Sequence, residues 1–456
     1  MTIQNLSSQE FYEKLNKVIR PSAPISSFEM LFGREKQVNE IEAALYADGR
    51  HVFIYGDRGV GKTSLAQTVA VKLQTRNDPI FVGCEPGSTL GTIVNDILLK
   101  AKISAGPASE TTWGASVSLM GTGLSAQHKR TEKPQSNEVN SVSSAVMALS
   151  TLSGKHSSVP HIVIDEFDQI ESAEERKNFG RLIKALGDQN LRIKLIFTGI
   201  SDSLHSLIGG HLSSERQIHQ TPLEALPWSG RDEIIDRAFG EFDLKLSEDV
   251  KFKISGLSDG YPHYVHLLCE KILQCAFSRD EEVKQIDQAL FLEGLQDAVS
   301  SVAETLKYDY VQATHCRPEY FHHMLWAMAD SGDLQREKKT IFFSYSHICE
   351  VRGYSQLESK QFDRQFSKLK TDDYGKVIIP ALEGRKGWFR FKENMLRGYV
   401  RMMAELNGVE LDFDRRFTAN EPSAQAVSYR SGSYRPLTPV ENQIYRREQM
   451  QLKSKS

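Results

Sequence analysis

The sequence lacks any long apolar segment. No stretch of about eighteen consecutive apolar residues, the length that crosses a bilayer, occurs in the chain. The N-terminal residues MTIQNLSSQEFYEKLNKVIR mix acidic and basic side chains and contain no apolar core of a signal peptide. We therefore expect a soluble, cytoplasmic protein without membrane contact.

The sequence also has few cysteines. The five are Cys84, Cys269, Cys275, Cys316 and Cys349. Their number is odd, they are scattered, and none belongs to a CxxC pair or has a histidine at zinc-site spacing. This pattern argues against a disulfide framework or a zinc module, and we expect reduced, buried thiols.

An excess of charge of either sign is absent as well. The chain contains 56 Lys and Arg residues and 59 Asp and Glu residues, which gives a net charge of -3. Such a protein is not a polycation, so any contact with nucleic acid has to come from a local basic patch.

Short apolar runs alternate with helical patterns in the first half of the chain. Val38, Ile41 and Leu45 share one face of a helix expected over 35–46. The apolar runs, each of which predicts a strand, lie at residues 51–55, 79–84, 161–164 and 193–198. Strands that alternate with helices predict an α/β fold with a parallel sheet covered on both faces.

A segment of different composition interrupts this pattern. Between residues 103 and 144 the sequence is rich in Ser, Thr, Gly, Ala and Lys, which cannot supply another core strand. We interpret it as an insertion. Val117–Leu119 and Leu124–Lys129 flank a glycine-containing turn, so the insertion either protrudes as a β-hairpin or is disordered.

The second half of the chain is mainly helical. Residues 229–301 show helical patterns throughout, which predicts a helical lid. After residue 317, three helical stretches precede Val377–Ile379, a turn at 384–387 and Trp388–Phe391, an order typical of a winged helix. The tail beyond Arg415 is rich in Ser, Pro, Arg and Tyr, which predicts disorder.

A glycine-rich loop follows the first expected strand. The pattern GxxxxGK[ST] is matched by Gly56, Asp57, Arg58, Gly59, Val60, Gly61, Lys62 and Thr63, and Ser64 continues it into a helix. The glycines let backbone N–H groups surround phosphate oxygens, and the helix dipole adds to this attraction. We expect Lys62 to contact the β- and γ-phosphates of ATP and the Thr63 hydroxyl to bind Mg2+.

An acidic pair ends the third apolar run. A magnesium–nucleotide site needs a carboxylate at the end of a neighbouring strand, and Asp165 supplies one. Glu166 is placed to polarise the attacking water, a role that separates hydrolysing ATPases from P-loop kinases. We therefore expect an ATPase that releases ADP and phosphate.

Five segments, in this order, resemble the AAA+ ATPases. They are Phe-Gly-Arg-Glu at 32–35, the glycine loop at 56–63, Ile-Asp-Glu-Phe-Asp at 164–168, Phe-Thr-Gly-Ile-Ser at 197–201 and Gly-Tyr-Pro-His at 260–263. Within that group the chain looks most like the branch of origin-recognition-complex-like initiators, transposition-regulator ATPases and STAND signalling ATPases. The resemblance implies a P-loop sheet of the AAA+/ASCE type with a helical lid, and a homo-oligomer that assembles with ATP.

The expected domain organisation follows from these patterns and from the resemblance. It comprises an N-terminal helical segment (1–23), a P-loop ATPase domain (24–228), a helical lid (229–310), a winged-helix domain (317–410) and a disordered basic tail (411–456).

The resemblance also assigns roles to single residues. It implies that Phe32, Gly33 and Arg34 lie by the adenine. The strand that ends at Thr198 should carry the polar residue called sensor 1. Ser201 and Asp202 are further candidates for it.

For two other assignments, the alternative is an ordinary structural role. In such families a neighbouring subunit often inserts an arginine near the γ-phosphate, and Arg216 is the candidate here, unless it is an ordinary surface arginine. Pro262 and His263 are similar to the GxP element of STAND proteins. His263 then either contacts the nucleotide or is a core or capping histidine.

Basic residues recur in the expected winged helix. Lys360, Arg364 and Lys368 are spaced by four residues, and Arg385 and Lys386 lie at the wing turn. A winged helix would contact the phosphates of double-stranded DNA in this way. A merely solvated charged face is the alternative.

Two functions therefore stay open. In one, the chain is a DNA-associated switch in which ATP assembles subunits and hydrolysis releases them. In the other, it is a STAND-like signalling or scaffold ATPase, for example in bacterial defence, whose winged helix packs internally and whose effector is a protein.

Overall fold

The chain folds into two compact units. The computed structural model describes residues 3–21, 30–74, 76, 78–101, 139–208, 216–381 and 385–413, without the side chains of residues 202 and 206. One unit comprises residues 24–57 and 61–224, and the other comprises residues 1–23, 58–60 and 225–456. Each unit is described by itself.

The first unit is built on a five-stranded parallel sheet. Its strands are β1 (His51–Tyr55), β2 (Ile80–Gly83), β3 (His161–Asp165), β4 (Lys194–Gly199) and β5 (Ile218–Pro222). They are arranged in the order β2-β3-β4-β1-β5, and every neighbouring pair is parallel. All strands therefore end at the same edge of the sheet, where polar residues that follow them gather.

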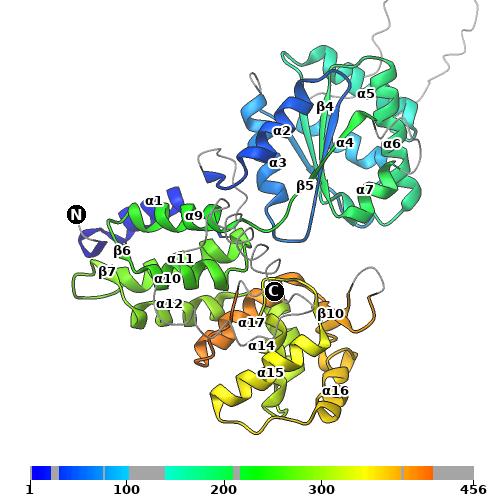
Figure 1. Cartoon of the computed structure of the whole chain (residues 1–456). Coiled ribbons are helices and arrows are strands. Elements are labelled where there is room, and N and C mark those ends of the chain that lie inside the picture. Colours follow the sequence, from blue (N-terminus) through cyan, green and yellow to red (C-terminus); the bar gives the residue numbers. More distant parts are fainter. Residues whose placement is uncertain are drawn as a thin grey trace, which may run out of the picture. The chain divides into compact units, whose positions relative to one another are not determined.

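Helices cover both faces of this sheet, with α2 and α3 on one side and α4, α5 and α6 on the other (Figure 1). The helices are α2 (Glu35–Tyr46), α3 (Lys62–Leu73), α4 (Leu90–Lys100), α5 (Val142–Lys155), α6 (Ala173–Asp188) and α7 (Ser201–Ile208), with a 3-10 turn η3 (Phe167–Gln169). Thr89, Ser141 and Ser172 are the N-caps of α4, α5 and α6, and each side chain accepts a hydrogen bond from a backbone N–H of the first turn.

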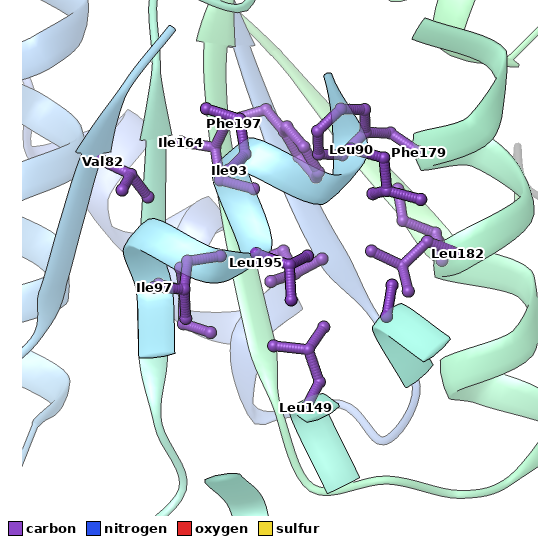
Figure 2. Packing of buried hydrophobic residues seen from close by; sticks show 14 of the residues in the cluster. Val82, Leu90, Ile93, Ile97, Leu149, Ile164, Phe179, Leu182, Leu195 and Phe197 are labelled. Atoms are coloured by element: carbon purple, nitrogen blue, oxygen red, sulfur yellow. The ribbon is translucent and has the colours of Figure 1, made fainter. Parts of the chain in front are cut away.

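The core of the first unit fills the space between the sheet and helices α4 to α6. Figure 2 shows Ile93 and Ile97 of α4 and Leu149 of α5 directed toward Leu195 on β4, with Leu182 of α6 beside them. These side chains are at most 1% exposed. The packing holds the strand ends at fixed positions.

The second unit begins with helices that form the lid. Its elements are η1 (Ile3–Asn5), α1 (Ser8–Val18), α9 (Trp228–Gly240), β6 (Lys245–Leu246), α10 (Glu248–Leu257), α11 (Pro262–Phe277), β7 (Gln285–Ile286) and α12 (Gln288–Ser301). The N-terminal segment packs on these helices: Phe11 stacks on Phe277 with ring centroids 4.2 Å apart, and the Gln4 amide donates to Ala276 O at 2.9 Å. Residues far apart in sequence thus build one helical body.

The same unit continues into a C-terminal module. Its elements are α13 (Glu304–Thr314), α14 (Tyr320–Ala329), β8 (Arg336–Glu337), α15 (Lys338–Arg352), α16 (Ser359–Lys368), η4 (Asp372–Tyr374), β9 (Ile378–Pro380), β10 (Trp388–Phe391) and α17 (Asn394–Leu406). β10 pairs antiparallel with both β8 and β9. Phe362 and Phe366 of α16 are buried, and the Phe366 ring lies 5.3 Å from that of Phe389 on β10. The helices α14, α15 and α16 precede β9 and β10 as expected, whereas β8 adds a third strand to the sheet. The assignment as a winged helix stays a prediction.

Four details differ from the sequence expectations. The acidic pair does not follow a strand adjacent to β1, because β4 lies between β1 and β3. The region 229–301 is not helical throughout, since β6 and β7 form a small parallel pair. Cys316 is exposed, whereas the other four cysteines are buried as expected. Phe413 is buried, so the folded part extends past residue 411.

Other expectations concern residues outside the described ranges. They are the β-hairpin or disorder of the insertion before α5, which begins at Val142, and the disorder of the tail from residue 414. Within the described ranges, no helix combines the length and apolar character needed to cross a bilayer.

Candidate nucleotide-binding site

The glycine-rich loop connects β1 to α3. Gly59 and Gly61 have φ angles of 79° and 96°, which lie in the left-handed region that glycine adopts without strain. Gly61 is the N-cap of α3, and Lys62 and Thr63 are its first two residues. The N–H groups of this first turn point out of the helix end, and the positive end of the helix dipole lies there, which attracts phosphate.

Lys62 folds back over the loop. Its Nζ donates to the carbonyl of Gly56 at 3.0 Å and to that of Asp57 at 2.8 Å. The ammonium group is therefore held above the same loop whose N–H groups would surround a phosphate. A point charge in this position suits the β- and γ-phosphates of a nucleotide.

Thr63 lies against the acidic end of β3. Its Oγ1 donates to Asp165 Oδ1 at 3.0 Å, although 102 positions separate the two residues. The sheet causes this approach, because β1 and β3 run parallel and end at the same edge. The two segments from which the sequence predicts a nucleotide site are thus brought together.

Thr198 connects the two acidic residues. It lies near the end of β4, is 1% exposed, and donates from its hydroxyl to Asp165 Oδ1. The same hydroxyl accepts from the Glu166 N–H at 3.0 Å. Glu166 has a φ angle of 54°, which is unusual for a residue other than glycine, and its side chain is exposed. The hydrogen bond from the Glu166 N–H to Thr198 holds the backbone in place and so fixes the direction in which the Glu166 side chain projects from the sheet.

The residues at this edge fit a magnesium ion. A hydroxyl oxygen and a carboxylate oxygen 3.0 Å apart are the hard donors that Mg2+ prefers, with water and phosphate completing an octahedron. Among the described residues, no group of three or more His, Cys, Asp or Glu side chains forms a metal site, and a nucleotide-bound Mg2+ does not require one.

The carboxylates also affect Cys84, which follows β2. Its N–H donates to Asp165 O at 2.9 Å. Burial, and then the negative charges of Asp165 and Asp168, raise the pKa of the Cys84 thiol to about 12. The thiol therefore stays neutral at physiological pH.

Arg34 lies at the start of α2, in the segment expected by the adenine. It is 4% exposed, and its Nη2 donates to Glu224 O at 2.6 Å. Burial lowers the pKa of Arg34 to about 10, opposed by Glu224, so the guanidinium stays charged at neutral pH. This bond attaches the expected adenine segment to the chain that leaves β5. Phe32 and Gly33 precede it, with Gly33 at a φ angle of 64°.

Residues 30–195 match the family described as "AAA ATPase domain". Over these residues the chain is similar to an AAA ATPase domain. The match spans the glycine loop and the acidic pair, which are the two halves of the site. The parallel sheet flanked by helices is the P-loop AAA+ fold expected from the sequence.

Solved structures similar to the whole chain are distant in sequence. The Walker-type ATPase PABY2304 of Pyrococcus abyssi is 15% identical, with a TM-score of 0.48, and the alignment covers 83% of this chain and 99% of that one. Cdc6p of Pyrobaculum aerophilum is 16% identical, with a TM-score of 0.42 and coverage of 86% and 97%. The Aeropyrum pernix ORC1 protein, solved in complex with DNA, is 17% identical, with a TM-score of 0.42 and coverage of 82% and 94%. No curated protein matches the sequence. Likeness at this level adds no argument about function.

The other residues predicted for the site are described one by one. Arg216 is exposed and lies two residues before β5. Ser201 is exposed at the start of α7, and the Asp202 side chain lies outside the described part of the chain. Pro262 begins α11 in the second unit, where His263 Nδ1 lies 2.8 Å from Pro21 O. That contact is what a capping histidine makes, so a nucleotide contact of His263 stays a prediction.

Two contributions to the site were not expected from the sequence. Thr198 was expected as a sensor, but its joint contact with Asp165 and Glu166 was not. The hydrogen bond from Arg34 to the carbonyl of Glu224 was not predicted. No local signal indicates a backbone partner 190 positions away, because such a pair depends on the packing of α2 against β5.

Proposed function

We propose that this chain is an ATP-hydrolysing molecular switch of the AAA+ and STAND kind. The observation that carries the proposal is the 3.0 Å hydrogen bond from Thr63 to Asp165, because it joins the glycine loop to the acidic strand end. The match of residues 30–195 to the AAA ATPase domain supports the same function. Titration with fluorescent ATP and a phosphate-release assay with Mg2+ test it. Absence of saturable ATP binding would remove the proposal.

Each residue of the site has its own part in hydrolysis. Lys62 and the N–H groups at the start of α3 bind the phosphates, and Glu166 polarises the water that attacks the γ-phosphate. Thr63 and Asp165 would hold Mg2+, which neutralises phosphate charge when bound. Thr198 is a positioning residue, since it holds the carboxylate of Asp165 and the backbone of Glu166.

We further propose that subunits complete the site when ATP is bound, with Arg216 reaching the nucleotide of a neighbouring subunit. Arg216 is exposed, as a residue that acts on another subunit has to be. Arg216→Ala should lower turnover only at protein concentrations where subunits associate, because the guanidinium stabilises transition-state charge in trans.

Phosphate release per subunit, measured over a wide range of protein concentration, tests this role. The wild type should become more active as concentration rises, and the variant should not. Arg192→Ala, which changes another exposed arginine of the same unit, is the control. An equal loss at every concentration would contradict a role in trans.

We propose double-stranded DNA as the partner of the C-terminal module. Lys360 and Arg364 are exposed on α16, and Arg385 and Lys386 are exposed before β10. Lys368 is less suited to DNA contact, because it is only partly exposed and its Nζ lies 5.9 Å from the Tyr374 ring centroid. The buried Phe362 and Phe366 hold α16 so that its basic side faces outward.

The double variant Arg385→Ala/Lys386→Ala should weaken binding to plain duplex DNA by about tenfold at low salt, because each lost phosphate contact removes one released counterion. Its affinity should also depend less steeply on salt concentration. Gel shifts with and without ATP, at several salt concentrations, measure both effects. Lys245→Ala/Lys284→Ala, which removes two exposed lysines of the lid, is the matched control.

The same gel shifts separate the two functions. If the wild type binds no DNA at low salt, the partner is a protein effector and the signalling function replaces the DNA-associated one.

A further inference from the structure

A buried ionic cluster lies between the lid helices and the C-terminal module. It consists of Asp259, in the turn between α10 and α11, and of Arg397 and Arg401 on α17. All three side chains are at most 6% exposed. Arg397 Nε and Nη2 each donate to a carboxylate oxygen of Asp259 at 2.6 Å, and its Nη1 donates to Asp333 O at 2.6 Å. The bidentate contact of Arg397 with Asp259 fixes the relative orientation of the two side chains as well as their distance.

Arg401 completes the cluster from the next turn of α17. Its Nη1 lies 2.9 Å from Asp259 Oδ1 and donates to Gly256 O at 2.9 Å. Its Nε donates to Ala329 O at 3.2 Å, and its Nη2 donates to Ser331 O at 2.6 Å. Gly256 is in the last turn of α10 and Ala329 ends α14, positions where the helix dipole favours a cation. One guanidinium thus joins a lid helix to a helix of the C-terminal module.

All three groups are charged at neutral pH. Burial raises the pKa of Asp259, but Arg397 and Arg401 outweigh this effect and hold that pKa below its usual range. Burial lowers the pKa of Arg401 to about 9, opposed by Asp259. A motion that breaks these contacts while one of the three groups stays buried would leave an unpaired buried charge, which is strongly unfavourable.

Close packing continues along α17 on both sides of the cluster. A methyl group at Gly398 would lie only 2.8 Å from the ring of Tyr264 on α11. The Tyr264 hydroxyl donates to Met395 O at 3.1 Å. Near the other end of α17, Glu405 Oε1 accepts from Lys253 Nζ of α10 at 2.8 Å. α17 is thus bonded to the lid at its start, middle and end.

We propose that the lid and the C-terminal module move as one rigid body, which α17 holds together through the Asp259–Arg397–Arg401 cluster. Asp259 directly precedes Gly260, so the cluster is attached to the turn from which α11 begins. Any displacement of the lid is then carried to the exposed basic residues of α16 without a hinge between them. This coupling goes beyond the proposed function and does not require hydrolysis.

Distance measurements between two spin labels test the rigid body. One label replaces Gln288 at the start of α12 and the other replaces Gln361 on α16, both exposed. Cys316→Ser removes the exposed native thiol of the described part, where the other cysteines are buried. Pulsed electron paramagnetic resonance should give a single narrow distance distribution. Its centre should move by no more than about 2 Å on addition of Mg-ATP, the scale of adjustments between packed helices. A broad or divided distribution in the wild type would overturn the proposal.

Two variants test the part played by the cluster. Asp259→Asn should broaden the distribution or add a second distance, whereas Asp280→Asn, at an exposed position after α11, should not. Gly398→Ala leaves the charges intact but drives a methyl group against Tyr264, and it should broaden the distribution as well. Circular dichroism checks that each variant is folded. A folded Asp259→Asn with the wild-type distribution contradicts the role of the cluster. Should that variant not fold, an unchanged distribution in a folded Arg397→Lys does so instead, because lysine keeps the charge but cannot make the bidentate contact with Asp259.

Discussion

Lys62→Ala is expected to lower the affinity of the chain for ATP by about a hundredfold, the upper range for loss of a hydrogen bond to a charged group. The Lys62 ammonium already lies over the glycine loop through its bonds to Gly56 O and Asp57 O. Alanine removes the ammonium group that is bonded to the loop, while the N–H groups of α3 remain. Equilibrium titration with a fluorescent ATP analogue measures the effect.

The control for this experiment is Lys177→Ala. Lys177 is a partly exposed lysine of α6 whose Nζ lies 3.9 Å from Glu174, so its loss should change neither folding nor affinity. Thermal unfolding of both variants distinguishes a lost phosphate contact from a lost fold. Retention of ATP affinity within about tenfold of the wild type would contradict the assignment of the loop.

Glu166→Gln should separate binding from hydrolysis. We expect ATP affinity close to that of the wild type and turnover reduced by about a hundredfold or more, the range for loss of a general base. The amide keeps the shape of the side chain, and the backbone anchors of Glu166 to Thr198 and Asp165 are unchanged by the substitution. Only the ability to polarise water is removed.

Phosphate release under saturating ATP, together with an ATP titration, measures the two quantities. Glu171→Gln is the matched control, because Glu171 is an exposed acid five positions further along the same connection. Turnover that survives in Glu166→Gln would mean that another group activates the water. Loss of ATP binding in the same variant would instead place Glu166 in the binding of nucleotide or metal.

A rigid lid and C-terminal module changes how the proposed switch would work. In a chain with a hinge between them, the basic residues of α16 would sample many positions whatever the nucleotide. If the buried cluster of Asp259, Arg397 and Arg401 holds the lid and the module together as proposed, they would sample few relative positions. Under the proposed function, a lid displaced by nucleotide would carry the basic residues of α16 with it, so that nucleotide and DNA would each alter the affinity for the other.

The sequence by itself determined the local parts of the nucleotide site. The apolar run at 51–55 became β1 with those bounds, because buried strands of a parallel sheet are apolar and glycine ends them. The glycines of the loop adopt the positive φ angles that their lack of a side chain permits. β3 ends at Asp165, where an apolar run gives way to acids that need solvent or a cation.

The tertiary structure alone decided how these parts meet. The same apolar runs are compatible with several strand orders, and only long-range packing inserts β4 between β1 and β3. This order brings Thr198 between the glycine loop and the acidic pair. Likewise, an aspartate and an arginine 138 positions apart resemble ordinary surface charges in the sequence. Their burial follows from the packing of α17 against the lid, since a charge leaves water only where a folded partner replaces its hydration.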